Sequence, residues 1–382
     1  MAARCGCVMT PAERIDLFLA AAFRREHPPW PSDWNADDER ERFLERVDYH
    51  GIGVLLLDRT MNWPGAVREA LKAQAISQAV WELKHRRLLE RLIDAMAARE
   101  ARPLFLKGTA LAYSVYDEPA QRDRADTDLL VQPRDVAQAR LALQECGLSR
   151  NAASADGELQ EVWRLDADGV SHVIDLHFAA FNTPYLDQIL PVEECFARAV
   201  PLPKLHAQAA MLSPAYCLLH TAIHRNLHRT APYFSGSTVN FGADRLIWAI
   251  DIALLGSQFD DAEWDNLVRL AEAKAVVRAT GEALRFSQTT AAAVIPAEVL
   301  DRLSIADSAE PRSEYLLDAG RRSRALTNFL ATGDWKAQIR RLRAIASPSD
   351  RALRMRYPEW PKAPRVLLLA RRLFDFALNS RR

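Results

Sequence analysis

The chain has 382 residues, more than one hydrophobic core usually supports, so we expect two or three domains. Its 49% hydrophobic and 26% charged residues are typical of a soluble globular protein. The formal net charge is zero, so the chain as a whole has no electrostatic attraction for nucleic acid, which disfavours a polymer substrate.

The first ten residues, MAARCGCVMT, contain no apolar segment of signal-peptide length, and no apolar run is long enough to span a membrane. The Cys5-Gly6-Cys7 pair is too short and isolated for a zinc site. Reduced thiols and a cytoplasmic location are therefore expected. The cysteines are Cys5, Cys7, Cys146, Cys195 and Cys217.

Residues 1–100 are predicted to form an N-terminal helical region. One helix is predicted from Pro11 to Arg25 and a longer one from Ala66 to Arg99, each with an apolar face turned inward. The predicted inward residues are Ile15, Leu17, Phe18 and Leu19 in the first helix, and Leu71, Ile76, Val80, Leu83, Leu88, Leu92, Ile93 and Met96 in the second. His50 and His85 are isolated histidines, for which we expect structural roles.

Residues 101–203 are predicted to alternate strands and helices. Strands are predicted at 103–106, 126–131, 161–165 and 170–178, and a helix from Arg134 to Cys146 that Gly147 ends. The segment Asp166-Ala167-Asp168-Gly169 predicts a hairpin turn between the last two strands. This order predicts an α+β fold, in which a small mixed sheet with helices on one side is flanked by N- and C-terminal helical regions.

The stretch from Leu104 to Val131 contains the residues best suited to chemistry. An apolar strand ends at Leu106, and Lys107-Gly108-Thr109 is predicted to turn the chain into a short helix from Ala110 to Tyr116. A glycine-led turn into a helix N-terminus presents backbone N–H groups to a phosphate. The stretch ends in an acidic strand, where Asp126 and Asp128 point to the same face, roughly 7 Å apart along the backbone. Two carboxylates on one face suit Mg²⁺.

A third carboxylate comes from the strand Val170–Phe178, where Asp175 lies among apolar residues and shares a face with His177. A carboxylate on such a strand is costly unless it binds metal, is paired, or lies at an edge. An Asp-x-Asp pattern alone is unspecific, because about one is expected by chance in a chain of this length. The order of strand, turn, helix and two acidic strands therefore carries the prediction of a nucleotidyl-transfer site.

Three segments, Leu106-Lys107-Gly108, Asp126-x-Asp128-Leu129-Leu130-Val131 and Ile174-Asp175-Leu176-His177, together resemble the uncharacterised bacterial nucleotidyltransferase family of the DNA polymerase beta-like superfamily. Similar segments outside this core are Leu219-His220 to His224, Arg245 to Asp251, and Arg354 to Pro358, so the resemblance covers most of the chain. The turn departs from the superfamily, which usually has Gly-Ser or Gly-Gly where this chain has Gly108-Thr109. The acidic strand also lies further from the turn than in minimal members.

The resemblance implies a nucleotidyltransferase that moves a nucleoside monophosphate from an NTP such as ATP to a hydroxyl or similar acceptor and releases pyrophosphate. The expected catalytic and metal-binding residues are Asp126, Asp128 and Asp175, which would hold two Mg²⁺ ions, or Mn²⁺. Asp175 would also draw the proton from the acceptor. The expected nucleotide-binding residues are Lys107, Gly108, Thr109, Arg122 and His177.

Two other functions stay open at this point. A catalytically silent fold would keep the sheet and bind a partner, as a regulatory or antitoxin-like module. An enzyme acting on RNA ends would use the basic C-terminal residues. The acceptor is not identified by the sequence, and a small molecule, a peptide or a protein is favoured over RNA because the total charge is neutral.

Residues 204–335 are predicted to be a helical domain that completes the cleft. A helix from Pro214 to His228 places His220, His224 and His228 on one face. Metal binding, contact with the nucleotide, and packing between domains all stay open for these histidines. In the next helix, Ala243–Leu255, Arg245 and Asp251 are expected to form a buried ion pair.

Residues 336–382 form a basic tail that contains 13 Lys and Arg but only three Asp and Glu. Its segment Val366–Leu378 is predicted to be an amphipathic, basic helix. We expect the apolar face of this helix to dock on the protein, and contact with an anionic membrane or with RNA is the alternative.

Overall fold

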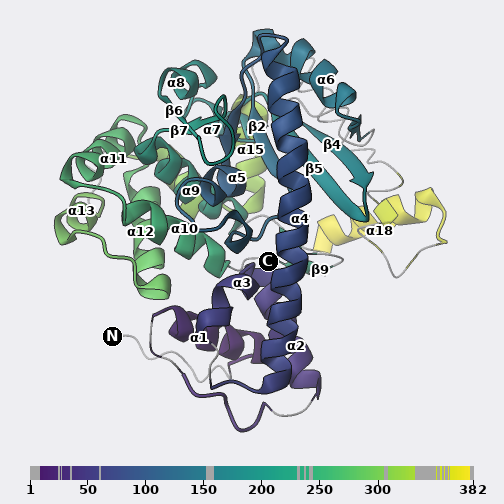
Figure 1. Ribbon diagram of the computed structural model, residues 1–382, viewed down its shortest axis with the longest axis vertical. Coiled ribbons are helices and arrows are strands. Elements are labelled where there is room, and N and C mark those ends of the chain that lie inside the picture. The colour runs from purple at the N-terminus through teal and green to yellow at the C-terminus, as the bar shows by residue number, and fades with distance from the viewer. Residues whose placement is uncertain are drawn as a thin grey trace. The chain divides into compact units, whose positions relative to one another are not determined.

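The computed structural model of the chain describes residues 9–24, 26, 28–34, 37–59, 62–151, 159–229, 233–235, 238–240, 244–304, 309–331, 350, 353–354, 357, 360 and 362–378 (Figure 1). It divides into two compact units, Met1–Arg324 and Ala325–Arg382, which are described separately. One hydrophobic core joins the helices and the sheet of the first unit, from Ile15 to Leu316. The predicted domain boundaries near residues 100 and 203 lie inside this unit and stay predictions.

The first unit begins with a group of helices. Thr10 starts the first of them with a capping box, in which its side chain accepts from the backbone N–H of Glu13 and its own N–H donates to the Glu13 carboxylate. The helical elements are α1 (Pro11–Phe23), α2 (Asp37–His50), α3 (Gly53–Leu56), the 3-10 turn η1 (Leu57–Arg59) and the 33-residue α4 (Gly65–Ala97). The two long helices predicted here are confirmed.

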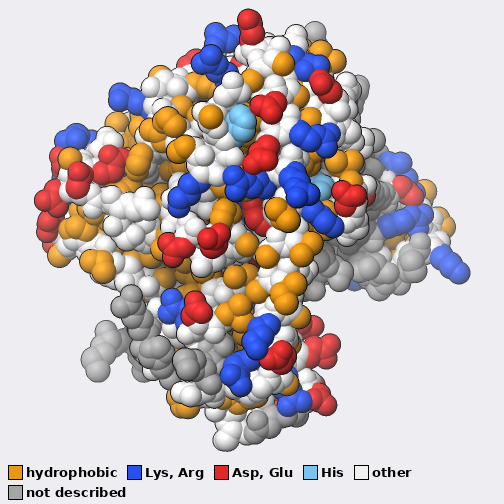
Figure 2. All heavy atoms as spheres, in the orientation of Figure 1, with side chains coloured by type: hydrophobic (Ala, Val, Ile, Leu, Met, Phe, Trp, Pro, Cys, Tyr) orange, Lys and Arg blue, Asp and Glu red, His pale blue; other side chains and the backbone are white. Residues whose placement is uncertain are grey.

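The predicted inward faces of these helices are partly wrong. Leu17 of α1 is 57% exposed, and in the middle of α4 the side chains of Ile76, Val80 and Leu83 are 67%, 45% and 55% exposed. Figure 2 shows apolar side chains on the surface over this part of α4. No residue of α4 between Leu71 and Glu82 is buried, and the next buried residues, Glu82 and His85, are polar because there the helix packs on a polar part of the sheet.

A seven-stranded mixed sheet follows, with the strand order β3-β4-β5-β2-β1-β7-β6. The strands are β1 (Leu104–Leu106), β2 (Thr127–Leu130), β3 (Ser149–Arg150), β4 (Gln160–Ala167), β5 (Val170–His177), β6 (Ala199–Pro201) and β7 (Ala210–Leu212). The mixed sheet and its flanking helices confirm the predicted α+β fold. Strands β3, β6 and β7 are missing from the prediction, since two or three residues are too few to show alternation.

Strand β2 lies in the middle of the sheet and determines where the acidic residues meet. It pairs antiparallel with β1, so that Leu106 lies opposite Asp128. It pairs parallel with β5, so that Asp128 lies beside Asp175. Strands β4 and β5 form the predicted hairpin, whose turn residues Asp168 and Gly169 have φ angles of 53° and 75°. The glycine suits this left-handed conformation.

The connections of the sheet differ from the prediction at one important point. Helix α5 (Lys107–Ala112) begins directly after β1: Lys107, with a φ of 48°, turns the chain, Gly108 and Thr109 already lie in the helix, and the helix ends before the predicted Tyr116. The other elements between the strands are η2 (Pro119–Gln121), η3 (Pro133–Asp135), α6 (Val136–Glu145), α7 (Pro184–Asp187) and α8 (Val192–Ala197). In Figure 1, α4 crosses the sheet over β2 and β5.

The rest of the first unit is mostly helical and packs around α9. Its helices are α9 (Pro214–His228), α10 (Leu246–Gly256), α11 (Asp261–Ala273), α12 (Val277–Ala291), α13 (Ala297–Arg302) and α14 (Pro311–Leu317). Between α9 and α10, the strands β8 (Tyr233–Ser235) and β9 (Thr238–Asn240) pair with each other. Helix α15 (Arg321–Ala331) crosses into the second unit.

The second unit contains α18 (Arg365–Leu378), which confirms the predicted C-terminal helix. Leu368 of α18 is buried against Leu353 and Tyr357, while Val366 and Leu367 are exposed. Much of the predicted basic tail, including residues 332–349, lies outside the described residues. Within the described part of the chain, no helix combines the length and the apolar character needed to cross a membrane.

Candidate metal and nucleotide site

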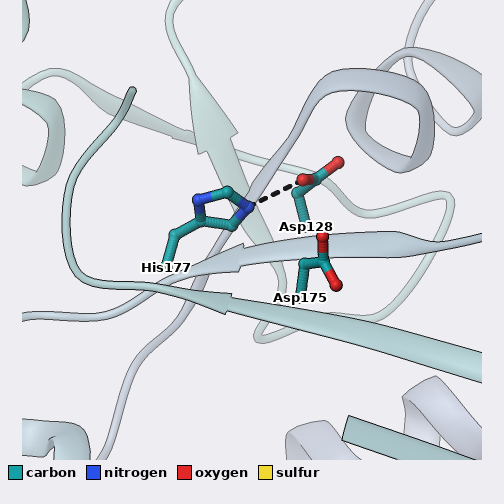
Figure 3. Close-up of side chains that lie close together, drawn as sticks. All are labelled: Asp128, Asp175 and His177. Carbon is teal, nitrogen blue, oxygen red and sulfur yellow. Dashed lines mark hydrogen bonds and ion pairs between the residues drawn. The ribbon is translucent and has the colours of Figure 1, made fainter. Parts of the chain in front are cut away.

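Asp128, Asp175 and His177 form a compact group of potential metal ligands on one face of the sheet. Asp128 comes from β2, and Asp175 and His177 come from the neighbouring strand β5, two residues apart, so their side chains point the same way (Figure 3). One ligand atom from each residue lies within 4.8 Å of the other two. Two carboxylates and an imidazole are donors that Mg²⁺ or Mn²⁺ accepts, with the imidazole favouring Mn²⁺. These residues therefore fit a divalent cation.

Asp128 is held by two donors on the same oxygen. Its Oδ1 accepts from Nζ of Lys107 at 2.5 Å and from Nε2 of His177 at 2.7 Å. Since a carboxylate only accepts, His177 carries a proton on Nε2 in this arrangement. Lys107 has a φ of 48°, a left-handed conformation that costs a non-glycine residue free energy and is often found at functional sites.

The three carboxyl groups have unequal pKa values because they repel each other in a partly buried site. Burial would raise the pKa of Asp128, but the charge of Lys107 and the hydrogen bonds from His177 and Lys107 lower it below its usual value. Burial and the charges of Asp128 and Asp126 raise the pKa of Asp175 to about 8. An additional positive charge beside Asp175 would relieve this repulsion, which is what a bound cation supplies.

Asp126 lies just before β2 and is not part of the compact group. Its side chain is exposed, although burial of the surrounding site and the charge of Asp128 raise its pKa to about 6. The structure thus brings two of the three predicted metal ligands together with His177, and leaves Asp126 at the open edge of the group. That Asp126, Asp128 and Asp175 act in catalysis stays a prediction.

Arg122 has a buried structural partner. It forms an ion pair with Asp251 of α10 through two contacts of 2.8 Å, and the hydroxyl of Tyr116 donates to the same carboxylate at 2.7 Å. The predicted pair of Arg245 with Asp251 is therefore wrong, because Arg245 instead donates to the carbonyl of Tyr49 at 2.6 Å. The positive charge of Arg122 still reaches Asp126, whose pKa it lowers.

Gly108 and Thr109 are buried behind the acidic group. The hydroxyl of Thr109 contacts that of Thr127 at 2.8 Å and accepts from Nε of Arg124 at 3.1 Å. A Cβ atom on Gly108 would lie 3.5 Å from the Arg124 side chain. The Thr109 hydroxyl is thus used within the protein, and a phosphate contact by Gly108 or Thr109 stays a prediction.

The three histidines of α9 lie in a row beside Trp248. His220 stacks on Phe181 with ring centroids 4.9 Å apart, and its Nε2 donates to the carbonyl of Ala180 at 2.9 Å. The rings of His224 and His228 are 4.3 Å apart, and each lies 6.1 Å from Trp248. Burial first, then the charge of Lys107, lowers the pKa of His220 and of His228 to about 4, so these imidazoles are neutral at neutral pH. For His220, packing is the role its contacts support.

Several polar residues behind the site were not predicted to lie there, and for His85 only a structural role was expected. They are Glu82 and His85 of α4, Arg124, Thr127 and His172, all of them buried. The only sign of them in the sequence is that Glu82 and His85 interrupt the apolar face of a long helix. The two residues of each contact are 42 or more positions apart in the sequence, so no local pattern identifies them. These contacts are His85–Thr127, Arg124–Glu82 and His85–His172.

Comparison with known families agrees with this geometry. The model of a family described as uncharacterised nucleotidyltransferase matches residues 36–292, more than half of the chain. The matched range includes Lys107, Asp126, Asp128, Asp175 and His177. No curated protein and no solved structure matches the chain.

Proposed function

The chain belongs to the family of uncharacterised nucleotidyltransferases, and on this basis we propose that it transfers a nucleoside monophosphate from an NTP to a hydroxyl or similar acceptor, with release of pyrophosphate. In this proposal it is a member of the DNA polymerase beta-like superfamily. The observation that carries the proposal is the group of Asp128, Asp175 and His177, whose ligand atoms lie within 4.8 Å of one another on adjacent parallel strands.

Asp128 and Asp175 would hold a divalent cation, with His177 either as a third ligand or as the donor that orients Asp128. Asp126, exposed beside them, would hold a second cation on the nucleotide side. Cations bound there would shield the triphosphate charge and favour loss of the proton from the acceptor hydroxyl.

The other side chains act through position and charge. Lys107 keeps Asp128 ionised and brings a positive charge to the edge of the group, where it would contact a phosphate oxygen. Asp175, ionised once a cation offsets the repulsion from Asp128 and Asp126, would accept the proton that the acceptor hydroxyl loses. Arg122 would contribute its charge at a distance, because its guanidinium is bound to Asp251.

Transfer of label tests this proposal directly. The purified chain is incubated with Mg²⁺ or Mn²⁺, each NTP labelled at the α-phosphate, and either the small-molecule or the protein fraction of a cell extract. We expect labelled product and equimolar pyrophosphate with at least one NTP. Asp175→Asn should abolish both, whereas Asp166→Asn, an exposed aspartate on the neighbouring strand, should not.

If a folded sample forms no labelled product with any of the NTPs in either fraction, the proposal is contradicted. Product formed equally well by Asp175→Asn would contradict the assignment of the site.

A further inference from the structure

A single turn of α4 lies behind the acidic site. Trp81, Glu82 and His85 project from it toward the sheet, on the side opposite to the Asp128 carboxylate. Asp128 and the preceding Thr127 alternate along β2, so Thr127 points toward α4 when Asp128 points toward the candidate metal site. This turn of α4 therefore contacts the acidic strand through its other face.

His85 and two threonines form a continuous hydrogen-bonded chain there. Nε2 of His85 lies 2.7 Å from the Thr127 hydroxyl, and that hydroxyl lies 2.8 Å from the hydroxyl of Thr109 in α5. On its other side, Nδ1 of His85 lies 3.0 Å from Nδ1 of His172 in β5. The chain is buried from end to end, and it ties together α4, α5, β2 and β5.

Arg124 closes this chain at its other end. Its Nε donates to the Thr109 hydroxyl at 3.1 Å, and its terminal nitrogen pairs with the buried Glu82 carboxylate at 2.7 Å. The Glu82 carboxylate also accepts from the hydroxyl of Tyr113, the residue directly after α5. Both ion-pair partners are buried, so the loss of either would leave an uncompensated charge.

The direction of the hydrogen bonds follows from Arg124. Its guanidinium can only donate, so the Thr109 hydroxyl accepts from it, and the Thr127 hydroxyl is the acceptor beside Thr109 to which Thr109 then donates. Thr127 then donates to Nε2 of His85, and His85 donates from Nδ1 to His172. With both imidazoles neutral, the donors of Arg124, Thr109, Thr127 and His85 along these contacts each meet an acceptor. Burial, followed by the charge of Arg124, lowers the pKa of His85 well below its usual value, in agreement with this assignment.

The position of Asp126 depends on the hydrogen-bonded chain more than the position of Asp128 does. Asp128 has backbone partners on both sides, opposite Leu106 in β1 and beside Asp175 in β5. Asp126 precedes the strand and has no backbone partner in either register. It lies between Arg124 and Thr127 in the sequence, and the side chains of both are part of the hydrogen-bonded chain. The backbone on either side of Asp126 is therefore held by the buried side chains of Arg124 and Thr127.

We propose that Glu82, His85 and Arg124 are positioning residues of the nucleotidyl-transfer site, which act through Thr109 and Thr127 to hold Asp126 and Asp128 at the distance that cation binding requires. The inference rests on the proposed function. It assigns to α4 a role in the chemistry that is separate from its packing in the core.

The test uses one isosteric substitution at Thr127, in the middle of the hydrogen-bonded chain. Thr127→Val removes the hydroxyl and keeps the shape, and Thr127→Ser restores the hydroxyl. Thr280→Val is the matched control, since Thr280 is equally buried and its hydroxyl donates to the carbonyl of Val276, directly before α12. Binding of Mn²⁺ is measured by electron paramagnetic resonance, and the melting temperature of each variant is recorded.

We expect Thr127→Val to weaken Mn²⁺ binding about tenfold, the lower end of the effects seen when a residue supporting a metal ligand is changed. Thr127→Ser should stay within about twofold of the wild type. Thr280→Val should bind Mn²⁺ as the wild type does, even if its melting temperature falls as far as that of Thr127→Val. Unchanged Mn²⁺ affinity in Thr127→Val, or an equal loss in Thr280→Val, would overturn the inference.

A second measurement does not depend on the proposed function. In ¹⁵N spectra of the histidine-labelled chain at pH 7, His85, assigned by its loss in His85→Gln, should be the neutral tautomer protonated on Nδ1. Protonation on Nε2 would overturn the hydrogen-bond chain itself. A folded wild-type chain that binds no Mn²⁺ would overturn the proposed function and, with it, the positioning role, whichever tautomer His85 adopts.

Discussion

The role of each residue at this site follows from the residues that it contacts on neighbouring strands and helices. Asp175 and His177 could be predicted as neighbours, because side chains two apart on a strand share a face. Their contact with Asp128 depends on the parallel register of β2 and β5, which cannot be predicted from any local sequence pattern. The partners of Arg122 and Thr109 could not be predicted either, since Asp251 lies 129 residues from Arg122 and Arg124 reaches Thr109 only after a loop.

The ion pair of Arg122 with Asp251 predicts a large loss of stability when one partner is removed. Asp251→Asn should lower the free energy of unfolding by roughly 3–5 kcal/mol, because it leaves the Arg122 charge buried without a counterion. The double variant Arg122→Met/Asp251→Leu should recover much of this loss.

Chemical denaturation measures both variants. Asp166→Asn, in the exposed pair with Arg164, is the control and should change stability by less than about 1 kcal/mol. A double variant as unstable as Asp251→Asn would contradict the buried-charge explanation.

His220 predicts a specific dependence of stability on pH. Burial lowers its pKa from 6.5 to about 4 in the folded chain, so below pH 6.5 the unfolded chain takes up a proton that the folded chain does not. The stabilising contribution is therefore present above pH 6.5 and is lost as the pH falls from 6.5 toward 4.

Between pH 6.5 and pH 5, His220→Gln should lose roughly 2 kcal/mol less stability than the wild type, at about 1.4 kcal/mol per pH unit. Denaturant titrations at both pH values give the difference. Parallel pH profiles for the two proteins would show that His220 is not the responsible group.

At the scale of elements, α4 shows where the pattern of a sequence and the pattern of packing differ. Its helical periodicity was sufficient to predict its existence and its ends within two residues. The same periodicity gave a wrong inward face in the middle: no residue between Leu71 and Glu82 is buried, and beside Leu83 the helix buries Glu82 and His85 on polar partners instead. An apolar stripe predicts a buried face only where the opposing surface is apolar.

This difference is testable by substitution. Ile76→Gln and Leu83→Gln should each change the free energy of unfolding by less than about 0.5 kcal/mol, because both side chains are exposed. Leu88→Ala, one turn further on the buried face of α4, should cost about 2–5 kcal/mol. Thermal or chemical unfolding measures these free energies. A large loss of stability in Leu83→Gln would indicate that Leu83 is buried, as the sequence predicted.

At the scale of the whole molecule, the candidate site belongs to the first compact unit alone. Lys107, Asp126, Asp128, Asp175 and His177 all lie in Met1–Arg324, within the range that matches the family. The general α+β plan could be predicted from the order of elements. The short strands that complete the sheet could not, since β3, β6 and β7 are defined by their neighbours more than by their own two or three residues.

Removal of residues 332–382 should therefore leave Mn²⁺ affinity within about twofold, because the compact group of ligands is complete without them. Electron paramagnetic resonance on the shortened and full-length chains gives the comparison. A loss of tenfold or more, in a shortened chain that keeps its helical circular-dichroism spectrum, would show that the basic C-terminal region takes part in the site.

The central claim is that Asp128 and Asp175 bind a cation that nucleotide binding needs. Calorimetric titration of ATP, GTP, CTP and UTP with Mg²⁺ tests it most directly, on the wild type, on Asp128→Asn/Asp175→Asn, and on Asp166→Asn/Asp168→Asn, which removes the other Asp-x-Asp pattern of the chain. We predict that at least one NTP binds the wild type and the Asp166/Asp168 variant only when Mg²⁺ is present, and does not bind the Asp128/Asp175 variant. Binding that is independent of Mg²⁺, or unchanged in the Asp128/Asp175 variant, would contradict the account.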